Sequence, residues 1–124
     1  MRLFNPGDIV AVNFPGVTGI KRRPAVIVSS AVYHGSRPDV IVGLITSQTA
    51  AALGPTDYLL QDWAQAGLRA PSAFRSFFPT LPPSTNPVLV GHLSARDWQS
   101  VRACVKVALA PLDDPVPRAA PTGN

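Results

Sequence analysis

The sequence contains no glutamate, a single cysteine (Cys104) and no long apolar run. One cysteine excludes an internal disulfide framework and is typical of proteins in the reducing cytoplasm. The longest apolar stretch, Val40–Ile45, is far shorter than the roughly 20 residues that a membrane-spanning helix needs. Pro6 and Gly7 interrupt the start of the chain, which argues against a secretory signal peptide. We therefore expect a cytoplasmic protein without a membrane segment.

The charged residues that are present are mostly basic. Eleven lysines and arginines stand against seven aspartates, which gives a net charge of +4 over 124 residues. Three of the cations follow one another at Lys21, Arg22 and Arg23. A basic, arginine-rich chain is suited to phosphate groups or to an acidic protein partner. An ordinary solvated surface has the same composition, so charge alone does not decide between these interpretations.

Proline and glycine divide the chain before residue 93 into short segments rich in apolar and β-branched residues. Segments of this kind, bounded by turn residues, predict β-strands. The predicted strands are Ile9–Phe14, Pro24–Ser30, Val40–Thr46, Thr56–Leu60, Ser72–Phe78 and Val88–His92. Two connections, Trp63–Arg69 and the proline-rich Pro79–Pro87, are expected to be loops. Short strands at this spacing favour a compact barrel over βαβ units.

After residue 93 the apolar residues recur at the period of an α-helix. Ser94 and Asp97 predict a capping box at the start of this helix, and Pro111 ends it. The predicted buried stripe consists of Trp98, Val101, Val105, Ala108 and Leu109. We expect one mainly β domain over residues 1–110 with a C-terminal α-helix. The proline-rich, polar residues 111–124 are expected to form a flexible tail.

The second and third predicted strands are joined by a short segment, Ala31–Asp39, that has no helical pattern. An antiparallel hairpin is the economical connection between them. If its centre lies near Gly35, residue 23 falls opposite residues 46–48, within about two residues in register. The length of the connection therefore predicts which residues meet at the open end of the hairpin.

The residues that meet there are polar: Arg23, Thr46, Ser47 and Gln48. A guanidinium, two hydroxyls and an amide can bind a phosphate without a metal ion. Pro24 favours this arrangement, because a residue that precedes proline is restricted to extended backbone conformations. We therefore predict a phosphate-binding corner built on Arg23, whereas Lys21 and Arg22 by themselves are typical of ordinary exposed positions.

The order of four segments resembles the MazF/PemK family of toxins. GDIVAVNFPGVTGIKRRPAVIVSS, residues 7–30, is similar to the family's opening: a Gly-Asp start, a flexible loop, then Arg-Pro and a β-branched strand. VIVGLITSQ, residues 40–48, resembles the third strand with its Thr- or Ser-bearing turn. AGLRAPSAFRSFF, residues 66–78, and VLVGHLSARDW, residues 88–98, resemble later landmarks. The resemblance covers nearly all of residues 7–110, and its specificity lies in the combined order and spacing.

The resemblance implies an SH3-like small β-barrel of the MazF/CcdB type, assembled as a homodimer. It further implies sequence-selective cleavage of single-stranded RNA, held in check by a cognate MazE-like antitoxin whose acidic, disordered segment lies along the RNA groove. The family's active arginine matches Arg23, and its hydroxyl residue matches Thr46, with Ser47 and Gln48 beside it. A second family arginine matches Arg75. The first loop, which gates and reads RNA in the family, matches residues 15–22 and so includes Lys21 and Arg22.

The chain departs from the family pattern after the second arginine. Some members carry an acidic residue two positions later, where this chain has Phe77. A further arginine of those members is replaced near Thr80 or Leu81. An acid–base pair is therefore not transferred to this segment, whereas the match at Arg23 and Thr46 is unaffected.

The chemistry that this reading implies needs no cofactor and no metal, because no residues have metal-ligand spacing. The RNA 2′-hydroxyl attacks the neighbouring phosphorus, and the products are a 2′,3′-cyclic phosphate and a 5′-hydroxyl. Arg23 and Thr46 stabilise the developing charge. The general base is not identified. The imidazole group titrates in a useful range, which makes His34 and His92 candidates, but one is expected in the hairpin loop and the other packed before the helix.

The aromatic residues allow two interpretations. Trp63 can stack on a base or cover one end of the barrel. The phenylalanines at 74, 77 and 78 can do the same, and strand alternation sends at least one of them into the core and leaves another for a dimer face.

Two alternative functions stay open from the residues. One is a CcdB-like toxin that poisons DNA gyrase, although the chain lacks the apolar C-terminal tip that such proteins use. The other is a barrel that binds RNA or a protein without catalysis.

Overall fold

The computed structural model describes residues 4–16, 19–50 and 53–110, so the predicted flexible tail lies outside the described residues. The elements are β1 (Asp8–Gly16), β2 (Gly19–Ile27), α1 (Ala31–Ser36), β3 (Val40–Thr46), β4 (Tyr58–Leu59), β5 (Ala73–Arg75), β6 (Thr80–Leu81), a 3-10 turn η1 (Pro83–Thr85), β7 (Val88–His92) and α2 (Ala95–Ala108). The prediction of a mainly β fold with a C-terminal α-helix is confirmed.

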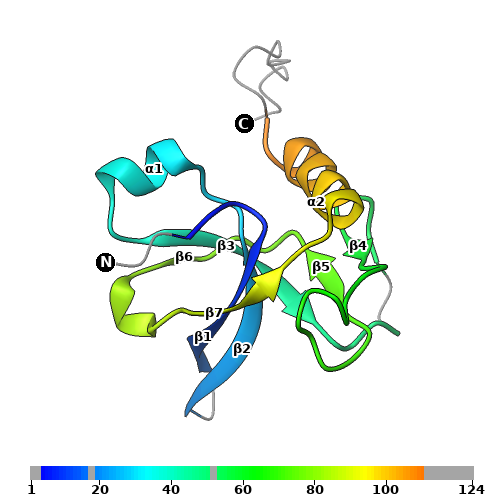
Figure 1. The fold of residues 1–124 in the computed structure, drawn as a ribbon, viewed down its shortest axis with the longest axis horizontal. Coiled ribbons are helices and arrows are strands. Elements are labelled where there is room, and N and C mark those ends of the chain that lie inside the picture. The colour runs from blue at the N-terminus through cyan, green and yellow to red at the C-terminus, as the bar shows by residue number, and fades with distance from the viewer. Residues whose placement is uncertain (1–3, 17–18, 51–52, 111–124) are drawn as a thin grey trace, which may run out of the picture.

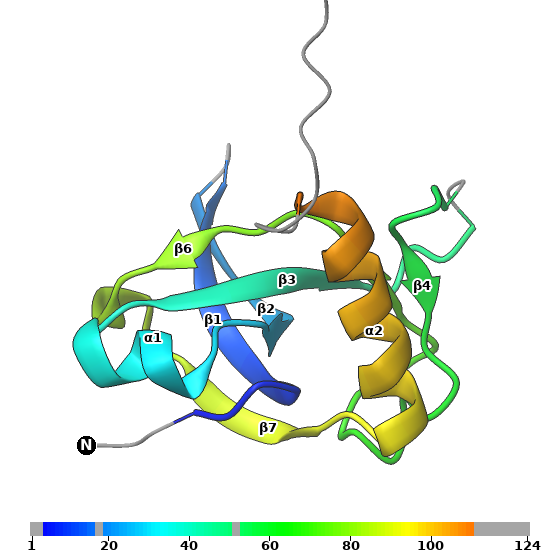
Figure 2. The ribbon, with the colours of Figure 1, turned by 90° about the horizontal axis from the view of Figure 1, so that it is seen from above.

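The strands form one antiparallel sheet in the order β4-β5-β3-β2-β1-β7, and β6 pairs with the first half of β3. The sheet curls into a half-barrel, with α1 beside the start of β3 and α2 beside its end (Figures 1 and 2). None of the helices within the described residues combines the length and apolar character that crossing a membrane requires.

The β1–β2 hairpin is longer than the sequence predicts. Its register runs from Ile9↔Val26 to Gly16↔Gly19, and its end projects from the body of the molecule (Figures 1 and 2). We predicted a flexible loop over residues 15–22, but residues 19–22 continue strand β2. Cross-strand pairing satisfies the backbone groups there, and Gly19 adopts a φ of +124° that few other residues tolerate at a turn.

The connection between β2 and β3 contains a helix that the sequence did not predict. Ser30 caps α1 by accepting a hydrogen bond from the Tyr33 N–H at 3.2 Å. A six-residue helix is too short to show a periodic apolar stripe, which explains the wrong prediction. The register was nevertheless predicted correctly to within one residue, since Ala25 pairs with Leu44 and Ile27 with Val42.

The predicted strand Ser72–Phe78 is shorter in the structure, where only Ala73–Arg75 forms β5. A further strand, β6 at Thr80–Leu81, lies in the segment predicted to be a loop. The break lies at Ser76, whose N–H donates to Asp57 Oδ1 at 3.1 Å, and at Phe77, whose N–H donates to the Arg75 carbonyl at 2.8 Å. These bonds interrupt the extended chain between β5 and β6, which both pair with β3.

Both faces of the central strands are buried, because alternate side chains enter two separate clusters. One cluster lies between the sheet and α2 and includes Ile9, Val26, Ile45, Phe74 and Val101. The other lies on the opposite face and includes Val10, Val12, Ala25, Ile27 and Val42. The two clusters thus mark the two faces of the sheet.

The buried face of α2 differs from the predicted stripe at its C-terminal end. Val101 is buried as expected, and Trp98 and Val105 are half-buried, but Ala108 and Leu109 are exposed. The helix also buries Asp97, whose carboxylate accepts hydrogen bonds from the Tyr58 hydroxyl at 2.7 Å and from the backbone N–H groups of Gln61 and Asp62 at 3.1 and 2.7 Å. The predicted capping bond from the Asp97 N–H to Ser94 Oγ is present at 3.3 Å. The N-terminus of α2 is thereby fixed to the segment after β4.

The close packing of this segment against β7 predicts a large effect of Gly91→Ala. A Cβ at Gly91 would overlap the Ala66 carbonyl oxygen, which is backbone and cannot rotate away. We expect the substitution to lower the free energy of unfolding by about 1–3 kcal/mol or more. Urea denaturation followed by circular dichroism measures the effect.

Gly35→Ala is the matched control, because a Cβ on that helical glycine meets nothing within 4 Å. It is expected to leave stability unchanged or raise it by roughly 0.5–1 kcal/mol. Equal stabilities of the two variants would contradict the packing described for Gly91.

Candidate functional site

Strands β2 and β3 separate at Pro24. The Val28 N–H donates to the Ile41 carbonyl at 2.9 Å. The backbone groups of every second residue point to the same neighbouring strand, so the backbone of Pro24, four residues before Val28, also faces β3. Proline has no N–H to donate, and the pairing of the two strands ends at Ala25↔Leu44. Beyond this point β2 pairs with β1 alone, whereas β3 continues against β5. The separation leaves an open corner between the two strands.

Arg23 and Thr46 lie on the same face at this corner. Arg23 precedes Ala25 by two residues and Thr46 follows Leu44 by two, so both side chains share the face of the paired Ala25 and Leu44. Arg23 is exposed and Thr46 is half-buried. Lys21, two residues farther along β2, belongs to the same face. The register therefore puts this guanidinium and this hydroxyl on one face of the sheet, two residues beyond the last pair of the two strands. That they act together on a phosphate stays a prediction.

Ser47 and Gln48 follow the end of β3 and are exposed. The Gln48 N–H donates to Thr46 Oγ1 at 3.1 Å, which fixes the position of that oxygen. The hydroxyl proton of Thr46 is not donated to any other described residue. Thr46 is thus a positioned hydroxyl with a free donor at the corner.

Arg75 supplies a second cation on this face, because it pairs directly with Leu44. Its Nη2 lies 3.7 Å from Asp57 Oδ2. Asp57 also accepts hydrogen bonds from the N–H groups of Gly54 at 2.9 Å and Ser76 at 3.1 Å. The Gly54 N–H, then the Ser76 N–H and the Arg75 charge, lower the pKa of the Asp57 carboxyl against the opposing effect of its burial. Arg75 therefore forms an ion pair with a carboxylate that two backbone N–H groups position.

Arg22 does not join this group, although the sequence analysis placed it among the supporting residues. Alternation along β2 puts it on the opposite face from Arg23. Its Nη1 donates to Asn13 Oδ1 at 2.9 Å and its Nη2 to the Asn86 carbonyl at 3.0 Å. In this position Arg22 links the hairpin to the segment between η1 and β7.

Both histidines lie away from the corner. His34 is in α1, with Nε2 2.5 Å from Ser29 Oγ and Nδ1 2.9 Å from the Phe4 carbonyl oxygen. His92 ends β7, and its Nδ1 lies 3.1 Å from Asp8 Oδ1. Neither histidine lies where the sequence predicted: His34 belongs to a helix and not to a hairpin loop, and the His92 side chain is largely exposed and not packed. Both have partners away from Arg23 and Thr46. Within the described ranges, no three side chains of histidine, cysteine, aspartate or glutamate gather closely enough to hold a metal ion.

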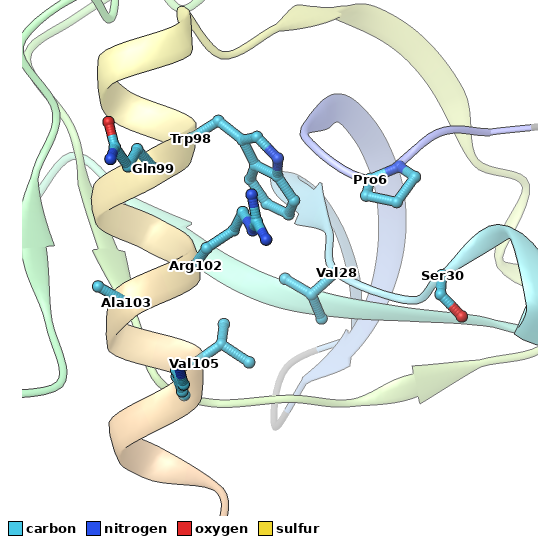
Figure 3. Close-up of a pocket in the computed structure, with 9 residues that line it drawn as sticks. Pro6, Val28, Ser30, Trp98, Gln99, Arg102, Ala103 and Val105 are labelled. Carbon is cyan, nitrogen blue, oxygen red and sulfur yellow. The ribbon is translucent and has the colours of Figure 1, made fainter. Parts of the chain in front are cut away.

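A cavity of about 760 Å³ lies elsewhere, between α2 and the segments that flank the sheet. Figure 3 shows Trp98, Arg102 and Val105 on the helix facing Pro6, Val28 and Ser30 across it. Val28 shares the face of Val26, which is the face opposite to Arg23. The cavity is therefore separate from the polar corner.

The Arg75–Asp57 pair was not predicted. Asp57 also accepts a hydrogen bond from the Gly54 N–H three residues earlier. The ion pair joins residues 18 positions apart across β4 and β5, and no local sequence signal reports it. Of the two interpretations of Trp63, the packed one agrees with the structure, since the residue is half-buried against the core cluster that includes Val101 of α2.

Comparisons with known proteins give a consistent picture. The family model described as "PemK-like, MazF-like toxin of type II toxin-antitoxin system" matches residues 5–109. No curated protein sequence matches the chain significantly.

Several solved structures have the same fold. The chain is 22% identical to a protein of the MazE–MazF complex (form II) from Deinococcus radiodurans, with a TM-score of 0.68 over 89% of this chain and 98% of that one. It is 17% identical to an endoribonuclease solved in complex with its cognate antitoxin from a mycobacterial species, with a TM-score of 0.66 over 86% and 94%. The Mycobacterium tuberculosis toxin MazF-mt6 is 21% identical, with a TM-score of 0.61 over 79% and 94%. The likeness supports the predicted MazF-type barrel.

The lowered pKa of Asp57 predicts how the Asp57→Asn variant behaves with pH. The folded-state pKa lies below that of the unfolded chain, so the contribution of Asp57 to stability is present above about pH 4 and is lost as the pH falls through the folded-state pKa. We expect Asp57→Asn to melt at a lower temperature than the wild type near pH 6, and the two melting temperatures to converge in acid.

Asp62→Asn is the reference variant, because hydrogen bonds from Arg96 and Ser94 lower the pKa of Asp62 to about 2. Its melting temperature should meet that of the wild type only near pH 2. A difference for Asp57→Asn that stays constant from about pH 6 to pH 2 would contradict the role assigned to the Asp57 carboxylate.

Proposed function

The chain belongs to the family of PemK-like, MazF-like toxins of type II toxin–antitoxin systems, and from this premise we propose that it is a metal-independent endoribonuclease that cuts single-stranded RNA. The observation that carries the proposal is the common face of Arg23, Thr46 and Arg75 at the point where β2 and β3 separate. Two guanidinium groups and a hydroxyl at an open sheet corner suit a bound phosphodiester.

The proposed reaction is an intramolecular transesterification. The RNA 2′-hydroxyl loses its proton and attacks the adjacent phosphorus, and the bond from phosphorus to the 5′-oxygen breaks. The leaving oxygen takes up a proton, so the products end in a 2′,3′-cyclic phosphate and a 5′-hydroxyl. DNA lacks the attacking group and is not a substrate.

Arg23 and Thr46 act on the charge that develops on the phosphoryl oxygens. Guanidinium groups stay protonated in proteins, so Arg23 serves as a fixed donor and not as a general base. The Thr46 hydroxyl, held by the Gln48 N–H, donates a second hydrogen bond, with Ser47 in support. Removing one such donor from an active site costs roughly 3–4 kcal/mol of transition-state stabilisation.

Lys21 and Arg75 bind the RNA backbone on either side of the reacting phosphate in this proposal. Arg75 is suited to that role because Asp57 fixes its position. Both histidines among the described residues have structural partners at other places in the fold. The proposal therefore relies on charge stabilisation instead of a histidine pair.

The proposal includes a cognate antitoxin and a homodimer in the cytoplasm. A similar Deinococcus radiodurans structure is a MazE–MazF complex, and a mycobacterial endoribonuclease was solved with its antitoxin. An acidic, disordered antitoxin segment is complementary to the cations of the corner, since the whole chain carries a net charge of +4. Such a segment would compete with RNA for the same residues.

Incubation of the purified protein with RNA of mixed sequence tests the activity. We expect fragments that end in a 2′,3′-cyclic phosphate, in equal yield with and without EDTA, and no cleavage of DNA of the same sequence. Blocked supercoiling by DNA gyrase would indicate the gyrase-poisoning alternative. RNA binding without cleavage would indicate the non-catalytic barrel, and either result would overturn the proposal.

Substitution of the corner residues tests the assignment of the site. We expect Arg23→Ala and Thr46→Ala each to lower the cleavage rate about 100- to 1000-fold and to abolish growth arrest in expressing cells. Arg23 is exposed, and Thr46 is the half-buried last residue of β3, so the free energy of unfolding should change by less than about 0.5 kcal/mol.

Arg37→Ala is the matched control, because it also removes an arginine, but beside α1 near the other end of β3. It should cleave RNA at the wild-type rate. Full activity in either corner variant would show that the site is misplaced.

A further inference from the structure

Phe77 is the one aromatic residue of the described chain that is largely exposed, at 58%. The two neighbouring phenylalanines are packed: Phe74 is fully buried, and the ring of Phe78 lies 6.2 Å from that of Phe74. The other large exposed apolar side chains, such as Val32 and Val107, are aliphatic. Packing in the core therefore leaves much of the Phe77 ring exposed.

The register of the sheet assigns Phe77 to the face of the candidate site. Strand β6 pairs with β3 at Val40↔Leu81. The same register extends to the residues before β6. The Val42 N–H donates to the Pro79 carbonyl at 3.1 Å, and the Leu44 N–H donates to the Phe77 carbonyl at 3.2 Å. Phe77 is therefore opposite Leu44. Directly opposed residues share a face, and the face of Leu44 is also that of Thr46.

The chain irregularity between β5 and β6 brings Phe77 next to Arg75. Leu44 is opposite Arg75 in β5 and opposite Phe77 in the continuation of β6, so one residue of β3 faces both. The Phe77 N–H is fixed by the Arg75 carbonyl at 2.8 Å, and Ser76 between them is held by Asp57. The backbone under the exposed ring is thus constrained on both sides.

We propose that Phe77 and Arg75 form a nucleobase subsite, in which a base of the RNA next to the reacting phosphate stacks on the Phe77 ring while Arg75 binds the backbone. The subsite rests on the proposed function, since it needs single-stranded RNA at the Arg23–Thr46 corner. Stacking on an aromatic ring tolerates any base, so the subsite supplies affinity and orientation rather than a sequence code. The neighbouring cations favour this occupant over a purely apolar partner, because RNA alternates bases with phosphates.

The test measures binding of an RNA oligonucleotide that the wild type cleaves, synthesised with 2′-O-methyl groups so that it stays intact. Phe77→Leu keeps an apolar side chain but removes the π-face, and we expect it to weaken binding roughly 5- to 150-fold. Phe77→Trp keeps the stacking surface and should bind as tightly as the wild type. Val32→Ala, which truncates an exposed residue of α1, should have no effect.

A second arm identifies the stacked nucleotide. Abasic sites are placed at each position of the oligonucleotide in turn, and binding to the wild type and to Phe77→Leu is compared. We expect one abasic position to weaken binding by the wild type but not to weaken binding by Phe77→Leu further. 2-Aminopurine at that position should lose fluorescence on binding the wild type and keep it on binding Phe77→Leu.

The outcomes separate the subsite from the function on which it rests. If the wild type cleaves RNA and Phe77→Leu binds it equally well, the subsite is wrong and the nuclease assignment stands. If every abasic position weakens binding by Phe77→Leu as much as binding by the wild type, no base stacks on Phe77 and the subsite is also wrong. If the wild type neither binds nor cleaves RNA, both proposals fail. Unchanged thermal unfolding of Phe77→Leu excludes misfolding as the cause of weaker binding.

Discussion

A missing backbone donor at Pro24 determines where the central sheet opens. Strand β2 pairs with β3 as far as Ala25↔Leu44, and the next residue of β2, Pro24, has no N–H to donate. Strand β3 turns to β5 and β2 stays with β1. Because side chains alternate, the residues just beyond the separation, Arg23 and Thr46, emerge on one face. A single proline thus opens a space that a continuous ladder would have closed with paired backbone.

Two aspartates, Asp57 and Asp97, hold the chain segments around this opening together. Asp57 holds the turn after residue 54, the break after β5 and the guanidinium of Arg75. Asp97, fully buried, ties the start of α2 to the segment after β4 through the Tyr58 hydroxyl and two backbone N–H groups. A buried carboxylate is stable only when hydrogen bonds replace its lost hydration. These two side chains therefore organise the half of the sheet that presents Arg75 and Phe77.

Much of the fold and part of the site could be predicted from local signals. The proline and glycine spacing located most of the strands, and the short connection 31–39 predicted the β2–β3 register to within one residue. The same signals failed for α1, which is capped by Ser30 and has no periodic stripe. They also failed for β6, because a two-residue strand forms only where β3 offers it a partner. Asn13 as the partner of Arg22 was not predicted, because it depends on the long β1–β2 hairpin.

The sequence by itself determined the mainly β architecture, the C-terminal helix with its Ser94 cap, and the β2–β3 register that puts Arg23 and Thr46 on one face. These features depend on turn chemistry, periodicity and loop length, which act over a few residues and are visible in the order of amino acids. Tertiary structure alone decided that Asp57 holds Arg75, that Asp97 is buried, and that Phe77 stays exposed beside Leu44 while Phe74 enters the core. Each of these depends on pairing between segments that are distant in the chain, where the register of one strand selects the face of another.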